Sequence, residues 1–286
     1  MKAKEQAQEE KSLQPKVEAQ PLRVEETHNV IFKPNEGPQT DFLAASEREV
    51  LYGGSAGGGK SYAMLADPLR YMGNPSFSGL LLRHTTEELR ELIYKSQELY
   101  PKIWKGIKWS ERKMQWTAPS GAKLWMSYLD REDDVLRYQG LAFSWIGFDE
   151  LTQWATPFAW NYMRSRLRST DPNLPVFMRA TTNPGGRGHH WVKKMFIDPA
   201  PYNNSFNATD IETGEELKYP SGHEKAGKAL FKRRFIPARL TDNPYLSNSG
   251  DYEAMLLSLP EQQRRQLLDG DWDIKEGAAF TEFDRN

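Results

Sequence analysis

The chain contains no cysteine, no long apolar run and no excess of one charge. Without cysteine among its 286 residues, it can form neither disulfides nor thiolate metal sites, which suits a reducing cytoplasm. The richest apolar stretch, Leu141–Phe148, includes Ser144 and Gly147 and is too short to span a membrane. The N-terminus also lacks the apolar segment of a signal peptide. With a formal net charge of −1, any binding of nucleic acid has to rely on local basic patches.

The most informative stretch that is present, Gly53–Ser61, fits the pattern G-x-x-x-x-G-K-[ST]. A β-like run, Glu49–Tyr52, precedes it, and a helical pattern, Ser61–Ala66, follows it. A strand, a glycine loop and a helix start in this order form a nest of backbone N–H groups that binds phosphate, which favours this reading over an ordinary flexible turn. Lys60 would then reach the β- and γ-phosphates, and the Ser61 hydroxyl would ligate Mg²⁺. The residues expected to contact the nucleotide here are Gly54, Ser55, Ala56, Gly57, Gly58, Gly59, Lys60 and Ser61.

Predicted strands and helices alternate along the chain. The spacing of apolar residues predicts helices over Thr86–Leu99 and Pro157–Leu167. A β-hairpin is expected with Trp109–Trp116 and Ala122–Tyr128 as its strands. Apolar runs without alternation predict parallel strands that are covered on both faces, at Ser78–Arg83, Ser144–Glu150 and Val176–Asn183. This order predicts an α/β fold with a mainly parallel sheet.

The chain is expected to divide into three parts. Residues 1–26 have no aromatic side chain and are rich in Lys, Glu and Gln. They cannot bury enough apolar surface to offset the entropy of ordering, so a disordered or loosely helical tail is predicted. Residues 27–200 hold the alternating pattern and are predicted to be the nucleotide-binding core. Residues 201–286 are turn-rich, with short helices near 248–257 and 260–268, and are predicted to form a small subdomain.

Polar residues follow two of the predicted strands, at the sheet edge where ligands of such folds bind. Asp149 is predicted to hold Mg²⁺ through water, and Glu150 to orient a water molecule toward the γ-phosphate. The alternative is a strand that ends in two solvated acids. A glutamate beside the metal-binding aspartate indicates a hydrolase, because a kinase has to keep water out. Thr182 and Asn183 could sense the γ-phosphate, although an Asn-Pro turn explains them equally well.

Other polar residues are candidates on weaker grounds. Gln39 could hydrogen-bond the edge of adenine, and Arg83 or Arg137 could stabilise charge in the transition state. Arg137 is the favoured arginine, although each could also be an ordinary surface or ion-pair residue. The basic residues that could contact nucleic-acid phosphates, or simply be solvated, are Arg164, Arg166, Arg168, Lys193, Lys194, Lys232, Arg233 and Arg234.

Taken together, these residues resemble the ATPase half of the large terminase subunit of tailed bacteriophages. The resemblance runs from about Phe32 to the C-terminus. The order of the motifs, with a late Gly-Asp-Trp, makes it more specific than two nucleotide-binding motifs alone. The stretches that carry it are Pro38–Leu43, Gly53–Ser61, Arg137–Gly140, Trp145–Glu150, Ala180–Pro184 and Leu268–Trp272.

The resemblance implies a RecA-like ATPase with an extra strand between the two Walker strands, followed by a lid subdomain. It implies ATP and Mg²⁺ as cofactors, and a motor that drives double-stranded DNA through the portal into a procapsid in the host cytoplasm. Further implied partners are the small terminase subunit and copies of the chain itself, usually in a pentameric ring. An arginine, here Arg137, would enter the neighbouring subunit's site. Gln39 would contact adenine, Glu150 would be the base, and Thr182 and Asn183 would form the coupling motif.

The sequence departs from the family in one respect. Family members continue into an RNase H-like nuclease domain, whereas this sequence stops at Asn286, so no nuclease activity is expected from it. Two alternatives to a packaging motor stay open. One is a helicase or another nucleic-acid translocase, although the second RecA-like motif set of many helicases is not seen. The other is an ATP-gated assembly factor that binds nucleotide with little turnover.

Overall fold

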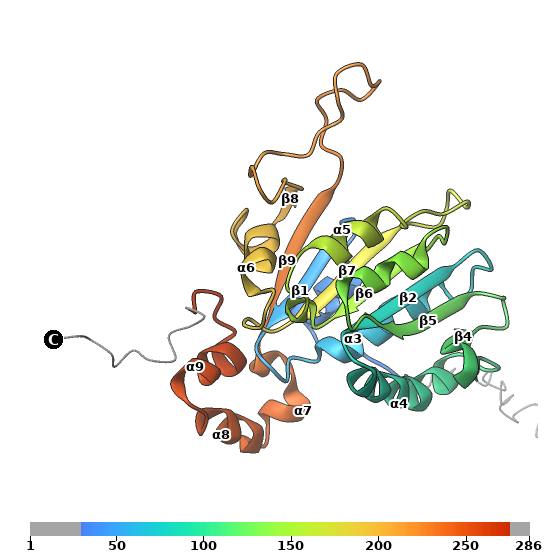
Figure 1. The fold of residues 1–286 in the computed structure, drawn as a ribbon. Coiled ribbons are helices and arrows are strands. Elements are labelled where there is room, and N and C mark those ends of the chain that lie inside the picture. The colour runs from blue at the N-terminus through green and yellow to red at the C-terminus, as the bar shows by residue number, and fades with distance from the viewer. Residues whose placement is uncertain (1–29, 275–286) are drawn as a thin grey trace, which may run out of the picture. The chain divides into compact units, whose positions relative to one another are not determined.

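The parallel strands of one sheet position the predicted site (Figure 1). The computed structural model describes residues 30–274, and all of these except Val30 belong to one compact unit that begins at Ile31. The tail predicted over residues 1–26 lies outside the described residues. The described strands form a nine-stranded sheet in the order β3-β4-β5-β2-β6-β7-β1-β9-β8.

Six neighbouring strands of the sheet are parallel, so their carboxyl ends meet at one edge. In spatial order they are β5 (Lys123–Tyr128), β2 (Ser78–Arg83), β6 (Trp145–Asp149), β7 (Phe177–Thr182), β1 (Glu49–Gly54) and β9 (Lys232–Ala238). Antiparallel strands flank these six strands. β3 (Lys108–Ser110) and β4 (Gln115–Thr117) lie on one side of them, and β8 (Ser205–Asn207) lies on the other. β7 pairs with both β1 and β6 and is the extra strand between them. The predicted mainly parallel α/β fold is confirmed.

Helices cover both faces of the sheet, which explains why its central strands are apolar without alternation. In β2, Leu81 packs with α3 (Lys60–Ala66) and α4 (Thr86–Ile103) in one core cluster. Leu80 and Leu82 belong to a second cluster on the other face, with side chains of α5 (Phe158–Arg164) and α6 (His189–Val192). A further helix, α2 (Pro38–Ala44), contributes Phe42 to a third cluster with Tyr52 of β1. Every central strand is therefore buried between two layers of helices.

Two local features fix the helices beside β6 and β2. Gly147 of β6 lets α3 lie close to the sheet, because a Cβ there would be 2.9 Å from the Met64 sulfur and closer still to the Trp145 ring. α4 begins where the Thr85 hydroxyl accepts a hydrogen bond from the N–H of Glu88 at 3.3 Å, which satisfies one of the free donors of the first turn.

The predicted hairpin is correct only in part. β4 and β5 form a hairpin through residues 118–122, but Trp109–Trp116 is not one strand. The exposed 3₁₀ turn Glu111–Lys113 separates β3 from β4, and Met114 after it has a left-handed backbone with φ 47°. Three consecutive charged side chains favour solvent over a strand that is packed against a neighbour, and this explains the interruption.

The C-terminal residues return to the carboxyl-end edge of the sheet. β9 pairs with β1 in the main sheet, and short helices follow it. These are α7 (Pro244–Ser247), α8 (Asp251–Leu257), α9 (Glu261–Arg264) and a π-helical segment, Arg265–Asp269. Where a separate subdomain begins within residues 201–286 stays a prediction. Among the described residues, no helix has the length and apolar character that crossing a membrane requires.

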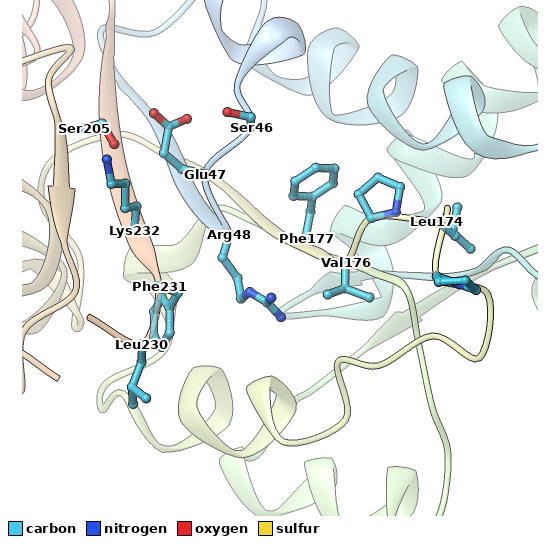
Figure 2. A pocket seen from close by; sticks show the side chains of 12 residues that line it. Ser46, Glu47, Arg48, Leu174, Val176, Phe177, Ser205, Leu230, Phe231 and Lys232 are labelled. Atoms are coloured by element: carbon cyan, nitrogen blue, oxygen red, sulfur yellow. The ribbon is translucent and has the colours of Figure 1, made fainter. Parts of the chain in front are cut away.

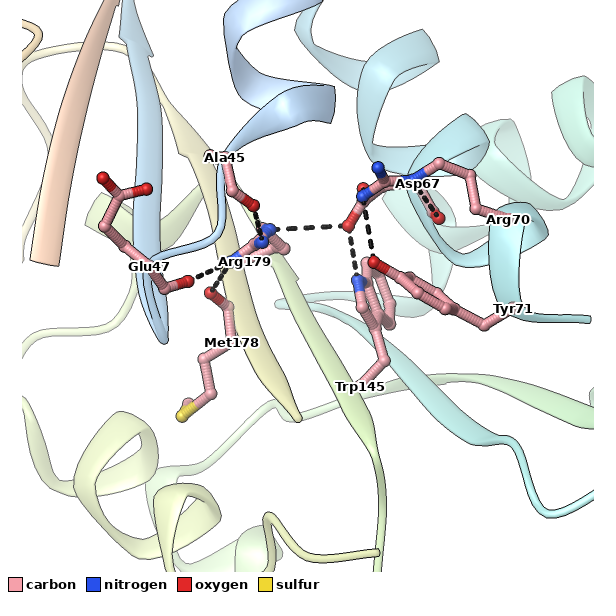
Figure 3. Close-up of polar contacts among 8 residues, drawn as sticks. All are labelled: Ala45, Glu47, Asp67, Arg70, Tyr71, Trp145, Met178 and Arg179. Carbon is pink, nitrogen blue, oxygen red and sulfur yellow. Dashed lines mark hydrogen bonds and ion pairs between the residues drawn. The ribbon is translucent and has the colours of Figure 1, made fainter. Parts of the chain in front are cut away.

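Buried charges are paired where the parallel strands begin. Arg179 of β7 is fully buried and donates to the carbonyls of Ala45 at 2.8 Å and Glu47 at 3.0 Å (Figure 3). Its Nε lies 3.4 Å from the carboxylate of Asp67, which also accepts a 2.7 Å hydrogen bond from the Trp145 indole. This network ties β7 to the loop before β1 and to the residue that follows α3.

A second ion-pair cluster and a hollow lie at the same edge. Glu49 of β1 is buried and accepts hydrogen bonds from Arg164 and, at 2.7 Å, from Arg233. Beside it is a hollow of about 820 Å³ (Figure 2). Its labelled lining residues are Ser46, Glu47, Arg48, Leu174, Val176, Phe177, Ser205, Leu230, Phe231 and Lys232.

Candidate nucleotide-binding site

At the opposite edge, the glycine loop and the ends of β6 and β7 surround a cavity of about 270 Å³. The loop and the start of α3 line one side of this cavity, and Glu150 and Asn183 line another. The structure therefore brings together residues from three motifs that are far apart in the sequence. Its lining residues are Ala56, Gly57, Gly58, Gly59, Lys60, Ser61, Tyr62, Lys95, Glu150, Asn183, Asn243 and Leu246.

The loop needs glycine and is fixed from outside. Gly57 and Gly59 have φ values of 77° and 78°, a region that side chains with a Cβ rarely adopt. The carbonyl of Gly57 accepts a 2.6 Å hydrogen bond from the Asn243 amide, and that of Gly58 accepts one from the Tyr52 hydroxyl at 2.9 Å. Because these carbonyls already accept hydrogen bonds from side chains, the loop N–H groups can form the anion-binding nest that the sequence predicts.

The nucleotide contacts predicted for Gly54 and Ser55 stay predictions. Gly54 and Ser55 do not line the cavity. The N–H of Ser55 donates to the Ala238 carbonyl at 2.8 Å, and its hydroxyl donates to the Leu268 carbonyl at 2.6 Å. The N–H of Ala56 likewise donates to the Leu267 carbonyl at 2.7 Å. The first part of the motif thus attaches the loop to β9 and to the C-terminal helices, and the cavity lining begins with Ala56.

Lys60 is buried at the centre of the site. Its ammonium group donates to the Ser55 carbonyl at 2.5 Å and to the Asn183 side-chain oxygen at 2.8 Å. Burial lowers the pKa of Lys60, and the nearby carboxylates Glu150 and Asp149 oppose that shift. The contact with Asn183 places the predicted γ-phosphate sensor directly against the residue that is expected to bind the phosphates.

The two acids differ in their surroundings. Asp149 is fully buried, and its carboxylate accepts a hydrogen bond from the Thr181 hydroxyl and lies 3.4 Å from Arg83. Glu150 is partly buried with φ 62° and accepts a 3.3 Å hydrogen bond from the N–H of Asn183. Burial raises the pKa of Glu150, and the neighbouring Asp149 raises it further. A carboxylate with a raised pKa beside a phosphate loop is suited to general-base chemistry.

The residues present fit a magnesium ion. Within residues 30–274, one carboxylate oxygen of Asp149 is buried without a hydrogen-bond partner, and Ser61, which carries a hydroxyl, lines the neighbouring cavity. Carboxylate and hydroxyl oxygens are hard ligands of the kind that Mg²⁺ prefers. Among residues 30–274, no cluster of three or more His, Cys, Asp or Glu could hold a metal ion.

A second cavity, of about 440 Å³, adjoins the first and contains Gln39. Gln39 is buried; its amide donates to the Gly59 carbonyl at 2.9 Å and accepts from the N–H of Asn35 at 2.6 Å. Its predicted contact with adenine stays a prediction. The lining combines ring and polar side chains, which suits a nucleoside base. These residues are Ile31, Phe32, Lys33, Asn35, Gln39, Gly59, Tyr62, Asn243, Tyr245 and Leu246.

The two candidate arginines lie in different places. Arg83 is buried and contacts Asp149, so it belongs to the site of its own chain. Arg137 lies in the 3₁₀ segment Glu132–Tyr138 with 43% of its side chain exposed, and it donates to the Tyr128 carbonyl at 2.8 Å. It does not line the nucleotide cavity. Any role of Arg137 in a neighbouring subunit's site stays a prediction.

The sequence reasoning missed two site residues. Asn243, which holds the glycine loop, could be read only as part of an Asp-Asn-Pro turn. No sequence pattern indicated Thr152. Its hydroxyl lies 2.7 Å from that of Thr182 and joins the loop after Glu150 to the end of β7. Both contacts link segments that are distant in the sequence, so no local pattern predicts them.

An additional strand between β1 and β6, a glycine loop with Lys60 and an acid pair at the end of β6 define a RecA-like, P-loop nucleotide-binding domain. The sequence model of the family described as "Terminase large subunit, T4likevirus-type, N-terminal" matches residues 51–286. The chain therefore belongs to this family of large terminase subunits.

Solved structures agree on the fold. The large terminase of a thermophilic bacteriophage in complex with ADP superposes with a TM-score of 0.58 at 15% identity, covering 84% of this chain and 54% of that one. The ATPase domain of the large terminase of a Thermus phage superposes with a TM-score of 0.52 at 12% identity, and the match covers 84% of this chain and 94% of that one. This chain thus corresponds to about half the length of the first of these proteins. No curated protein sequence matches it.

Proposed function

We propose that this chain is the ATP-hydrolysing motor part of a large terminase, which moves double-stranded DNA into a viral procapsid. The observation that carries the proposal is the position of Glu150. Its carboxylate is held by the N–H of Asn183, at a cavity lined by the glycine loop and Lys60. The large terminase of the thermophilic bacteriophage was solved with ADP and with ATP-γ-S, which supports a nucleotide as the ligand of the corresponding cavity here.

Different side chains would have different roles in ATP hydrolysis. The loop N–H groups and Lys60 would bind the phosphates, and Lys60 would exchange its contacts with the Ser55 carbonyl and Asn183 for phosphate oxygens. Ser61 and Asp149 would hold Mg²⁺, which neutralises phosphate charge when it is bound. Glu150 would accept a proton from the attacking water, and such a base contributes about 10²–10⁴-fold in rate.

The proposed partners follow from the family. They are double-stranded DNA, the portal and procapsid, the small terminase subunit and further copies of this chain in a ring, with the work done in the host cytoplasm. Among the basic residues predicted to meet DNA, Arg233 is buried against Glu49 and is not available. Lys232 and Arg168 are exposed and remain candidates. Phosphate contacts of this kind are salt-dependent and independent of sequence.

A Glu150→Gln variant tests the proposal. It should bind ATP as the wild type does but hydrolyse it at least about 100-fold more slowly, because the amide cannot accept the proton from water. The matched control is Glu98→Gln, the same change at an exposed position of α4. Turnover is measured with and without double-stranded DNA and procapsids.

Three results would count against the proposal. Unchanged turnover in Glu150→Gln would remove Glu150 as the base. ATP binding without turnover in the wild type, even with DNA and procapsids, would favour the assembly-factor alternative. Turnover stimulated by DNA but indifferent to procapsids would favour another translocase.

A further inference from the structure

Asn183 connects three parts of the site through different atoms. Its side-chain oxygen accepts from Lys60 at 2.8 Å, and its N–H donates to Glu150 at 3.3 Å. Its carbonyl lies 3.2 Å from the hydroxyl of Thr152 and 3.1 Å from that of Thr182. The backbone that positions the predicted base is therefore itself held by two hydroxyl groups.

The two hydroxyls form a closed set of hydrogen bonds. They lie 2.7 Å apart, both residues are buried, and the Thr182 oxygen also accepts from the N–H of Thr152 at 3.2 Å. Two protons are available, so either hydroxyl can donate to the other while its partner donates to the Asn183 carbonyl. Both arrangements satisfy every group, which avoids the cost of burying an unpaired hydroxyl.

This threonine pair, Thr152 with Thr182, holds a strained segment. Glu150 is not glycine but has φ 62°, a conformation that costs free energy unless its surroundings fix it. Thr152 follows two residues later, and its carbonyl accepts a 2.7 Å hydrogen bond from the N–H of Gly188. The pair thus joins the segment that carries Glu150 to both ends of the loop after β7.

We propose that Thr152 is a positioning residue for ATP hydrolysis. Its hydroxyl, paired with Thr182, holds the Asn183 backbone against Glu150, so that Glu150 keeps its orientation when Lys60 moves from Asn183 to a phosphate. The inference rests on the proposed function, because it concerns the efficiency of the same reaction. Thr152 touches neither nucleotide nor water in this role and acts only through Asn183 and Glu150.

The test compares Thr152→Val with Thr152→Ser, because valine keeps the shape and loses the hydroxyl whereas serine keeps the hydroxyl. Thr152→Val should lower kcat about 10-fold, the cost of about one weakened hydrogen bond in the transition state, and leave the Kd for ATP unchanged. Thr152→Ser should restore kcat. The control is Thr117→Val in β4, where a partly buried hydroxyl accepts one hydrogen bond from Gln115. Turnover and equilibrium ATP binding are measured in parallel.

The comparison of turnover with binding separates positioning from simple structural damage, because damage to the site would raise the Kd for ATP as well as lower kcat. Thr182→Val should lower kcat to a similar extent with the Kd for ATP unchanged, and the double variant should add little to either single change because both break one pair.

Several outcomes would overturn the inference. One is a Thr152→Val enzyme with wild-type kcat, and another is an equal loss of kcat in Thr152→Ser. If Thr152→Val does not fold, a Thr182→Val enzyme with unchanged kcat overturns it as well. A wild type that binds ATP without turnover removes the proposed function and this role together. By contrast, an active wild type with an unaffected Thr152→Val removes this role alone.

Discussion

The two edges of the central sheet both contain buried charged groups, but they pair them differently. Where the strands begin, Glu49 accepts from two arginines, and Asp67 is bound by the Trp145 indole, by Arg70 and by Arg179 at ion-pair distance. Each of these two carboxylates has at least two donors.

Where the strands end, the acids have fewer donors. Among the described residues, Asp149 has the Thr181 hydroxyl and an arginine at 3.4 Å, with one oxygen free of hydrogen bonds, and Glu150 has a single 3.3 Å contact. Within hydrogen-bond distance, Lys60 contacts only neutral oxygens of that part of the chain. Incompletely paired buried charge is typical of places where charged ligands bind. One edge therefore stabilises the fold, and the other has the incomplete pairing that is expected of a site for charged ligands.

The largest expected effect is at the strand-start edge. Arg179→Met should lower the free energy of unfolding by about 3–5 kcal/mol, because Asp67 would lose its buried guanidinium and three backbone carbonyls their donor. The control Arg90→Met, at an exposed position of α4, should change the free energy of unfolding by no more than about 0.5 kcal/mol. Urea denaturation of the nucleotide-free protein measures both. A loss below about 1 kcal/mol for Arg179→Met would contradict the view that this edge stabilises the fold.

Lys60→Met should behave in the opposite way. It removes a buried cation that has no ion-pair partner among the described residues, so the nucleotide-free protein should lose no stability. The variant should instead lose the stabilisation that bound ATP gives the wild type. That stabilisation is about 2.7 kcal/mol when the ATP concentration is a hundred times its Kd. Melting curves with and without Mg²⁺–ATP measure this, with Lys102→Met on the exposed side of α4 as control. A destabilised nucleotide-free variant, or one that ATP still stabilises, would be the contrary result.

The sequence predicts the functional edge better than the stabilising one, for a physical reason. The glycine loop and the Asp149–Glu150 strand are continuous in the chain, so local patterns reveal them. Arg179 lies inside an apolar strand and finds its partner Asp67 only through the fold. Thr152 and Asn243 likewise act across long sequence separations. Loop residues Gly54 and Ser55 matched the motif, but tertiary contacts with β9 and the C-terminal helices turned them away from the cavity.

The smallest effect is a difference in the sign of pH dependence between Glu49 and Glu150. Burial would raise the pKa of Glu49, but Arg233 and Arg164 outweigh it, and the pKa is lowered. Glu49 thus stabilises the fold above the ordinary glutamate pKa, and this contribution is lost as the pH falls through its lowered value. Glu150 has a raised pKa, so its charge destabilises the fold above that value, and the cost disappears as the pH falls to the ordinary one.

Glutamine variants convert this difference into a measurement. At neutral pH, Glu49→Gln should be less stable than the wild type and Glu150→Gln more stable. On acidification, the difference in stability between each variant and the wild type should shrink. For Glu150→Gln this should happen above the ordinary glutamate pKa, and for Glu49→Gln below it. Urea titrations at a series of pH values, without nucleotide, follow both. If the two variants changed stability with the same sign at neutral pH, the two edges would not differ in the way their hydrogen bonds indicate.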